Sequence, residues 1–490
     1  MHTRRDQVQA HLFTLSRVTG GLIRAEPDAA ETPMRRFTIG AVAGTAIGLV
    51  SLGGMVAFGL ISPGVTNSFK KQGTIVVEKE TGTRYIFLDG ALHPVLNQAS
   101  VLLVSGKPVT QRKGGLFGRA AGIQTISSKS LKGVPKGSPI GIVGAPDNLP
   151  DAKALDRGSW TVCSATTRSQ DGTEQKSVTA YLGGAGKGVT ELDDQQSLLV
   201  TSDDGTSHLA WLDRRLKIPS SPVLTALGYA GAASFEVKAS WLNSLPAGAD
   251  LKGPDVPGRG TAGPPVGGAA TRVGQVFRDP SGSFFLLLKD GLSPLSKTEA
   301  ALVLADPQTA LAYPNAQVLP TEVGTSAVAG AARSAREPTG TQHPAQPPTA
   351  VTNEGGATRV PCFRVTPGTA GESAKLRIAF RDSAPAKAAA QTAGLPRPAV
   401  PGSSQVADRV VVAPGGGVLV RQEAPAGEAE PRIYLITDLG VKYALTADVA
   451  GKLGYDAAGA VTIPSTVLDL VPTGPALDPE AARQPLAVNP

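Results

Sequence analysis

The most pronounced hydrophobic feature of the chain is an uncharged run over residues 37–61, FTIGAVAGTAIGLVSLGGMVAFGLI, directly after Arg35 and Arg36. As a helix rising about 1.5 Å per residue, it reaches about 37 Å, enough to cross a hydrocarbon core of about 30 Å. A secretory signal peptide is the alternative. The run exceeds the usual apolar length of such peptides and lies far from the N-terminus, with no clear small-residue cleavage site after it. We therefore predict a retained transmembrane helix.

Basic residues flank this run unequally. Lys70 and Lys71 follow it closely, whereas the arginines before it are Arg4, Arg5, Arg17, Arg24, Arg35 and Arg36. Positive residues near a membrane helix stay on the cytoplasmic side. Residues 1–36 are therefore predicted to form a cytoplasmic arm with an amphipathic helix, and residues 70–490 an extracytoplasmic domain.

Glycines recur at every fourth position inside the apolar run, at Gly40, Gly44 and Gly48. This spacing places them on one helix face, where small residues let a second membrane helix approach closely. Glycine is also common in membrane helices in general, so background composition is the alternative to a helix-packing surface.

Four segments of the outer part share a pattern of strand, tight turn and strand: residues 84–95, 208–219, 284–295 and 432–445. Aspartate and glycine tolerate the positive φ that hairpin turns require. The predicted turn residues are Asp89, Gly90, Asp290, Gly291, Asp438 and Gly440.

A short helical stretch follows each hairpin, and a second element then recurs in which Leu stands four residues before Pro and Gly two residues after it. The Leu lies on the helix face and the Pro ends the helix. The three copies are Leu131, Pro135 and Gly137; Leu242, Pro246 and Gly248; and Leu468, Pro472 and Gly474. The third hairpin lacks a clean copy and is followed only by NAQVLPTEV over residues 315–323.

These patterns predict a mainly β protein with short helices, in which small lobes surround a central β-sheet core in an elongated outer domain. Each lobe is too small to bury much surface alone. The lobes are expected near residues 84–150, 205–270, 273–330 and 430–477, and the core strands near 160–204 and 361–425. Residues 252–270, 326–361 and 383–404 are expected to be flexible linkers and residues 478–490 a disordered tail, because they lack an apolar period.

The chain has two cysteines, Cys163 and Cys362, both in strand-like segments of the predicted outer part. An oxidising compartment allows them to pair. We expect a disulfide between neighbouring strands of the central sheet; two unpaired buried thiols are the alternative.

Composition and charge exclude several classes of function. Gly 58 and Pro 40, about a fifth of the chain, with 4% aromatic residues indicate a loop-rich β protein. A net charge of +7, spread over 490 residues, gives no nucleic-acid footprint. The histidines have no ligand spacing, so no metal site is predicted.

The nearest approach to a phosphate-binding loop is GGAGKG over residues 183–188. A P-loop requires glycine where Tyr181 stands and Ser or Thr where Gly188 follows Lys187. No G-x-S-x-G motif occurs either. We predict no catalytic residue and no cofactor, and expect the chain not to be an enzyme.

Several motifs, taken in order, carry a family resemblance: the arm RRDQVQAHLFTLSRVTGGLIRAE with TPMRR, then PIGIVGAPDNLP, WTVC, ADRVVVAPGGGVLV, IYLITDLGVKYAL and IPSTVLDLVPTGPALDP. With the membrane helix and repeated lobes, the chain resembles the EccB component of the actinobacterial type VII (ESX) secretion machinery over nearly its whole length.

The resemblance implies a single-pass cell-membrane protein whose outer domain lies in a periplasm-like space. It implies a structural subunit that assembles with EccC, EccD and EccE in a six-fold inner-membrane complex, touches neighbouring copies, and meets secreted WXG-type proteins only indirectly. Some family members are labelled ATPases, but the motor resembles an FtsK-type ATPase on another subunit. A membrane-anchored cell-wall binding module, carrying sugars on Tyr85, Trp211, Phe284 and Tyr434, or a cell-wall hydrolase is the alternative function.

Overall fold

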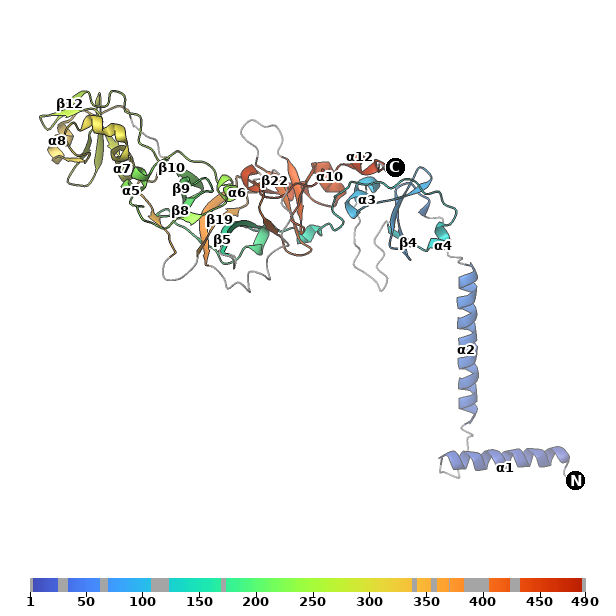
Figure 1. Ribbon diagram of the computed structural model, residues 1–490. Helices are drawn as coiled ribbons and strands as arrows, with labels where there is room; N and C mark the ends of the chain where they lie inside the picture. The colour runs from blue at the N-terminus through green and yellow to red at the C-terminus, as the bar shows by residue number, and fades with distance from the viewer. Residues whose placement is uncertain are drawn as a thin grey trace. The chain divides into compact units, whose positions relative to one another are not determined.

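The computed structural model describes most of the chain (Figure 1). The described residues are 3–24, 34–61, 69–106, 123–168, 173–336, 342–353, 359–369, 371–382, 405–423 and 432–486. The chain divides into two compact units. Residues 1–71 and 126–134 form the first unit, and residues 72–125 and 135–490 form the second.

Two long helices, α1 (Arg4–Arg24) and α2 (Met34–Ile61), make up most of the first unit. The stretch Phe37–Val56 of α2 is long and apolar enough to cross a membrane, and none of it is buried in the protein. An apolar helix with no protein around it is stable only where another apolar medium covers it. The helix predicted from the hydrophobic run is therefore present, three residues longer at its N-terminal end.

The second unit is built largely from a fourfold structural repeat, although residues 126–134, at the end of the first copy, are grouped with the first unit. Each copy has the order strand, strand, strand, helix, strand, helix, and its sheet runs third, second, first, fourth strand. The first copy comprises β1 (Thr74–Glu78), β2 (Arg84–Leu88), β3 (Ala91–Pro94), α3 (Gln98–Ser105), β4 (Ile123–Ile126) and α4 (Ser128–Leu131). The second comprises β8 (Gln196–Thr201), β9 (Ser207–Trp211), β10 (Arg214–Ile218), α5 (Ser221–Ala226), β11 (Phe235–Glu236) and α6 (Ala239–Asn243).

The third and fourth copies keep this order. The third comprises β14 (Val276–Arg278), β15 (Phe284–Leu288), β16 (Gly291–Leu295), α7 (Lys297–Ala305), β17 (Thr321–Glu322) and α8 (Thr325–Gly330). The fourth comprises β22 (Gly417–Gln422), β23 (Ile433–Thr437), β24 (Lys442–Leu445), α10 (Ala447–Lys452), β25 (Val461–Ile463) and α11 (Ser465–Leu468). In the second to fourth copies, the fourth strand pairs in parallel with the first.

Each repeat thus begins one strand earlier than its sequence pattern indicates. Two stretches expected in the central sheet belong to repeats instead, so this expectation is wrong. Residues 197–203 contain most of β8, and residues 417–420 are part of β22. Both strands are buried on two sides. Leu198 of β8 faces the largest core and Leu199 faces another. A strand that is buried on both faces has a continuous apolar sequence, which is also typical of a central strand.

The third repeat has a structural equivalent of the recurring Leu-Pro-Gly element, which includes α8 and the residues after it rather than residues 315–323. In every copy the third strand exchanges two backbone hydrogen bonds with the chain after the last helix. In the third copy Leu292 N donates to Ala332 O and Ser334 N donates to Leu292 O. Pro472 and Gly474 make the matching bonds with Lys442 in the fourth copy. Ala332 and Ser334 replace the Pro and Gly, so the sequence conceals this copy.

The central sheet has the strand order β21-β6-β5-β19-β20-β7. Trp160 and Phe363, both fully buried, lie on the face that packs against the second and fourth repeats. The strands are β5 (Trp160–Arg168), β6 (Glu174–Tyr181), β7 (Thr190–Glu191), β19 (Arg359–Thr366), β20 (Lys375–Asp382) and β21 (Arg409–Val411).

The repeats also share cores in pairs. One core joins the first repeat to the fourth, with α3 contacting α10 and α12 (Pro479–Arg483). Another joins the second repeat to Leu302 of the third, where α5 packs on α7. These helices are grouped in the same way in Figure 1. Each small lobe therefore buries surface that it lacks the volume to bury alone.

Several expected linkers are ordered where the structure describes them. Residues 262–272 form a hairpin of β12 (Ala262–Val266) and β13 (Ala269–Arg272). Within residues 326–361, α8 and β18 (Thr349–Ala350) are regular structure, and β18 pairs in parallel with β8. Short polar strands of this kind have no apolar period to reveal them. Residues 383–404 lie outside the described residues.

The expected disordered tail is wrong for residues 478–486. The Asp478 side chain accepts a hydrogen bond from Glu480 N, and Pro479 occupies the first turn of α12. This is typical helix-start chemistry. Ala482 is fully buried, and Pro485 bridges to Ile140.

Candidate functional site

A disulfide joins Cys163 of β5 to Cys362 of β19. The two residues are directly opposite each other on antiparallel strands, with their Cα atoms 4.0 Å apart. The bond links positions 199 residues apart in sequence, at the middle of the central sheet. Cys163 is 5% exposed and Cys362 is fully buried, so both sulfur atoms are shielded from solvent.

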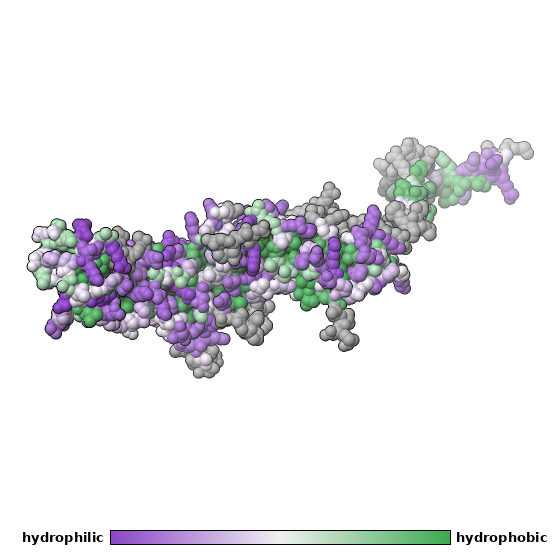
Figure 2. Space-filling view, turned by 90° about the horizontal axis from the view of Figure 1, so that it is seen from above, coloured by the Kyte–Doolittle hydropathy of each residue, from purple (hydrophilic) through white to green (hydrophobic). Residues whose placement is uncertain are grey.

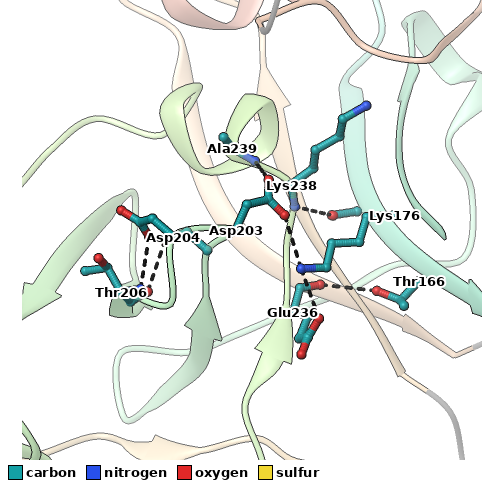
Figure 3. A network of polar contacts seen from close by, with 10 residues as sticks. Thr166, Lys176, Asp203, Asp204, Thr206, Glu236, Lys238 and Ala239 are labelled. Carbon is teal, nitrogen blue, oxygen red and sulfur yellow. Dashed lines mark hydrogen bonds and ion pairs between the residues drawn. The ribbon is translucent and has the colours of Figure 1, made fainter. Parts of the chain in front are cut away.

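A polar network lies where the second repeat meets the central sheet (Figure 3). Lys176 Nζ of β6 lies 2.9 Å from a Glu236 carboxylate oxygen and 3.1 Å from an Asp203 carboxylate oxygen. The other Asp203 oxygen accepts a hydrogen bond from Ala239 N, at the start of α6. The hydrogen bond with Glu236 is the main cause that raises the pKa of Lys176. One lysine thus connects a central strand to two segments of the repeat.

Asp408 forms the second half of this contact. Its carboxylate accepts from Val178 N at 2.7 Å and pairs with Lys238 Nζ at 2.6 Å. The backbone N–H of Lys238 donates to Ser164 Oγ of β5 at 3.2 Å. Sequence reasoning missed these groups, because their partners are far apart in the chain and single charged residues in strands give no signal of pairing.

The Gly-rich loop at residues 183–188 has an internal carboxylate beside its backbone amides. The carboxylate oxygens of Asp156 accept hydrogen bonds from Gly158 N at 2.6 Å and from Gly184 N at 3.0 Å. A phosphate loop leaves such amides open for an anion. Thr161 Oγ1 donates to Gly186 O and holds the loop against the sheet, while Lys187 is exposed. The backbone N–H of Gly184 is therefore already bound to the Asp156 carboxylate.

The three glycines of the membrane helix occupy one face of α2. A Cβ atom added at Gly40, Gly44 or Gly48 meets no atom within 4 Å. The face is therefore open in this chain. Arg35 and Arg36 lie in the first turn of α2.

Asp89, Gly90, Asp290 and Asp438 lie in turns, whereas Gly291 begins β16 and Gly440 follows the turn. Asp89 and Gly90 have φ of 49° and 81°, Gly291 has φ of 143° and Gly440 has φ of 65°. Asp290 and Asp438 accept hydrogen bonds from Ala335 N and Gly415 N, so both aspartates tie their hairpin to another segment. The turn of the second repeat uses Leu212 at φ 53°.

No group of three or more metal-binding side chains occurs in the part of the chain that the structure describes. Of the aromatic residues considered for sugar binding, Tyr85 and Tyr434 are buried, and Trp211 donates its ring N–H to Asp194 O. The side of the larger unit seen in Figure 2 mixes hydrophilic and hydrophobic residues without a continuous apolar face. The contacts described here are strand pairing, a disulfide and ion pairs.

Comparison with known proteins gives related chains of similar length. The ESX-3 secretion system ATPase EccB3 of Mycolicibacterium smegmatis is 27% identical over 508 residues, covering 99% of this chain and 92% of that protein. The ESX-2 secretion system ATPase EccB2 of Mycobacterium tuberculosis is 27% identical, covering 98% of this chain and 94% of that protein.

Solved structures share the fold. A chain of an intact ESX-5 inner membrane complex matches with a TM-score of 0.64 and 23% identity, covering all of this chain and 96% of its own. The EccB3 dimer from the ESX-3 core complex matches with a TM-score of 0.63 and 24% identity, covering 84% of this chain and all of its own.

The family described as "Type VII secretion system ESX-1, transport TM domain B" matches residues 1–487. Membrane helix, repeats and central sheet all lie within this range. The chain therefore belongs to the EccB family of type VII secretion proteins.

Proposed function

We propose that this protein is a structural subunit of a type VII secretion inner-membrane complex. The observation that carries the proposal is the family match over residues 1–487, which includes both the membrane helix and the outer repeats. The shared fold with a chain of an intact ESX-5 inner membrane complex supports it. In this role α2 anchors the protein, and the outer unit helps to build the extracytoplasmic part of the export channel together with neighbouring copies, EccC, EccD and EccE.

In this proposal the arm containing α1 is cytoplasmic and the outer unit is extracytoplasmic. The excess of arginine before α2 supports this orientation. A disulfide in the outer unit agrees with it, because such bonds persist in oxidising compartments.

The subunit is proposed to have no ATPase activity of its own, although relatives carry that name. The Asp156 carboxylate beside Gly184 N supports this, since it places a negative charge where a phosphate would bind. Full-length protein purified in mild detergent should hydrolyse ATP only at background. ATP hydrolysis that disappears in Lys187→Ala, with Lys153→Ala as the exposed-lysine control, would overturn this part of the proposal.

The structural role is tested by co-purification. Tagged full-length protein extracted in mild detergent should bring down the other membrane subunits of the same secretion system. Gly40→Leu/Gly44→Leu/Gly48→Leu keeps α2 apolar but blocks close helix packing, so membrane insertion should persist while co-purification falls. The matched control is Val42→Leu/Ile47→Leu/Val50→Leu, which adds no bulk at the glycine face. A wild-type protein that purifies alone under these conditions contradicts the structural role.

A further inference from the structure

The outward face of the central sheet carries an unusual number of basic residues. Side chains alternate between the two faces of a strand. Those sharing a face with Cys163 and Cys362 point away from the core that contains Trp160 and Phe363. We call this surface the basic face. It comprises Arg364 of β19, Lys375, Arg377 and Arg381 of β20, and Arg409 of β21, as the strand registers place them.

One acidic residue lies among these positions in the described strands, Glu191 of β7. Its carboxylate is 3.3 Å from an Arg364 guanidinium nitrogen. No ion pair to Lys375, Arg377 or Arg409 occurs within the described part of the chain. The basic face therefore has a positive charge that its own strands do not balance.

Two of these charges directly oppose each other. Arg364 and Arg377 are cross-strand partners in the antiparallel pair β19–β20. Like charges at such positions destabilise a sheet. Glu191 offsets the charge of Arg364 within the sheet, whereas Arg377 has no ion pair among the described residues, so an anionic partner lying over β20 would offset the charge that remains.

Two guanidinium groups on this face also have an unfilled donor. The Nε atoms of Arg364 and Arg381 are buried and have no hydrogen-bond partner. Arg381 stacks over the ring of Tyr181, with its guanidinium carbon 4.6 Å from the ring centre. The charges of this face that are open to a ligand include the exposed side chains of Lys375 and Arg377 on β20. Residues on one face of an extended peptide repeat about every 6.8 Å, and Lys375, Arg377 and Arg381 lie on one face of β20 at one or two such repeats from each other.

We propose that the basic face binds an extended, acidic polypeptide segment whose carboxylates pair with Lys375, Arg377 and Arg381 along β20. This is a binding function beyond the structural role proposed above. Carboxylate–guanidinium hydrogen bonds are strong and directional, so several of them in a row give both affinity and register.

The experiment uses full-length protein in mild detergent and a fluorescent deca-glutamate peptide as the probe, read by fluorescence anisotropy at low salt. The test variant is Lys375→Glu/Arg377→Glu. The control is Lys153→Glu/Lys252→Glu, which changes the net charge equally at exposed positions outside the basic face. Unchanged thermal unfolding establishes that both variants fold, and Lys375→Gln/Arg377→Gln replaces the test variant if the glutamate variant does not fold.

Binding should weaken by about tenfold or more in the test variant and stay within about twofold of wild type in the control. Equal loss in both variants means that the probe senses net charge only and overturns the proposal. So does unchanged binding in the test variant. Phosphatidylglycerol vesicles form a parallel arm: binding to vesicles but not to deca-glutamate, lost in the test variant, would make the face a lipid surface and overturn the polypeptide assignment.

Discussion

Lys238 and Asp408 form an ion pair of 2.6 Å across 170 residues of sequence, between the second repeat and the strand that closes one edge of the central sheet. Asp408 also accepts a hydrogen bond from Val178 N, so removing the aspartate side chain leaves this backbone N–H without its acceptor. The Asp408 carboxylate thus has two partners, Val178 N and Lys238 Nζ, whereas the ion pair of Lys238 Nζ is with Asp408.

This asymmetry predicts different costs for the two truncations. Asp408→Ala should lower the free energy of unfolding by about 1–3 kcal/mol, since it leaves the Val178 N–H without its acceptor. Lys238→Ala should lower it by about 1 kcal/mol or less, because the pair is partly exposed to solvent. Urea unfolding followed by tryptophan fluorescence measures both. Equal costs would show that Val178 N finds another acceptor.

The disulfide should stabilise the protein mainly by restricting the unfolded chain. On the chain-entropy model, a bond spanning 199 residues contributes up to about 5 kcal/mol. Cys163→Ser/Cys362→Ser should therefore unfold at lower urea concentration than wild type. Dithiothreitol should lower the stability of wild type toward that of the variant and leave the variant unchanged. Non-reducing peptide mapping that finds both thiols free in the mature protein contradicts this prediction.

The glycine after the recurring Leu-Pro element should resist substitution. A Cβ atom at Gly474 would lie 2.5 Å from Cε1 of Tyr443, which is buried. Gly474→Ala should therefore cost about 1–3 kcal/mol through overpacking. Gly451→Ala is the matched control: Gly451 lies in α10 with open space around its Cβ position, and alanine there should stabilise by about 0.5–1 kcal/mol. Thermal unfolding should shift in opposite directions for the two variants.

His208 should make stability depend on pH. Burial is the main cause that lowers its pKa below 6.5, and Arg215 and Lys217 lower it further. Between 6.5 and the lower folded-state pKa, the unfolded chain binds more protons than the folded chain, so the free energy of unfolding falls as the pH falls through this window. Below the folded-state pKa the loss is complete. Urea unfolding at a series of pH values from 7.5 to 5 checks this, and His208→Gln should flatten the dependence.

The hairpins and the membrane helix could be predicted because their signals are local. An uncharged run of membrane length and a turn such as Asp89-Gly90 act within a few residues. The first strand of each repeat could not be assigned to its repeat from the sequence, because that assignment depends on contacts with distant parts of the chain. Leu198 and Leu199 face different cores, and a sequence does not show which apolar residue faces which core. The element of the third repeat could not be recognised in the sequence, because Ala332 stands where the other copies have Pro. The backbone carbonyl of Ala332 accepts the same hydrogen bond that the Pro carbonyl accepts in those copies.

The candidate site also has a part that could be predicted from the sequence and a part that could not. Cys163 and Cys362 were identifiable because the chain has two cysteines, so composition alone limits the pairing. The network of Lys176, Asp203 and Glu236 depends on the strand register, which follows from the complete fold. The basic face also depends on register, because Arg364 and Arg377 oppose each other only once β19 and β20 are paired.

The core shared by the first and fourth repeats has a mechanical consequence. The first repeat follows the membrane helix in the chain, and residues as distant as Leu477 and Ala482 pack into the same core. A pulling force on the membrane helix would therefore enter the larger unit at the repeat that packs against residues 477 and 482. The shared core passes this load from the first repeat to the fourth through side-chain packing.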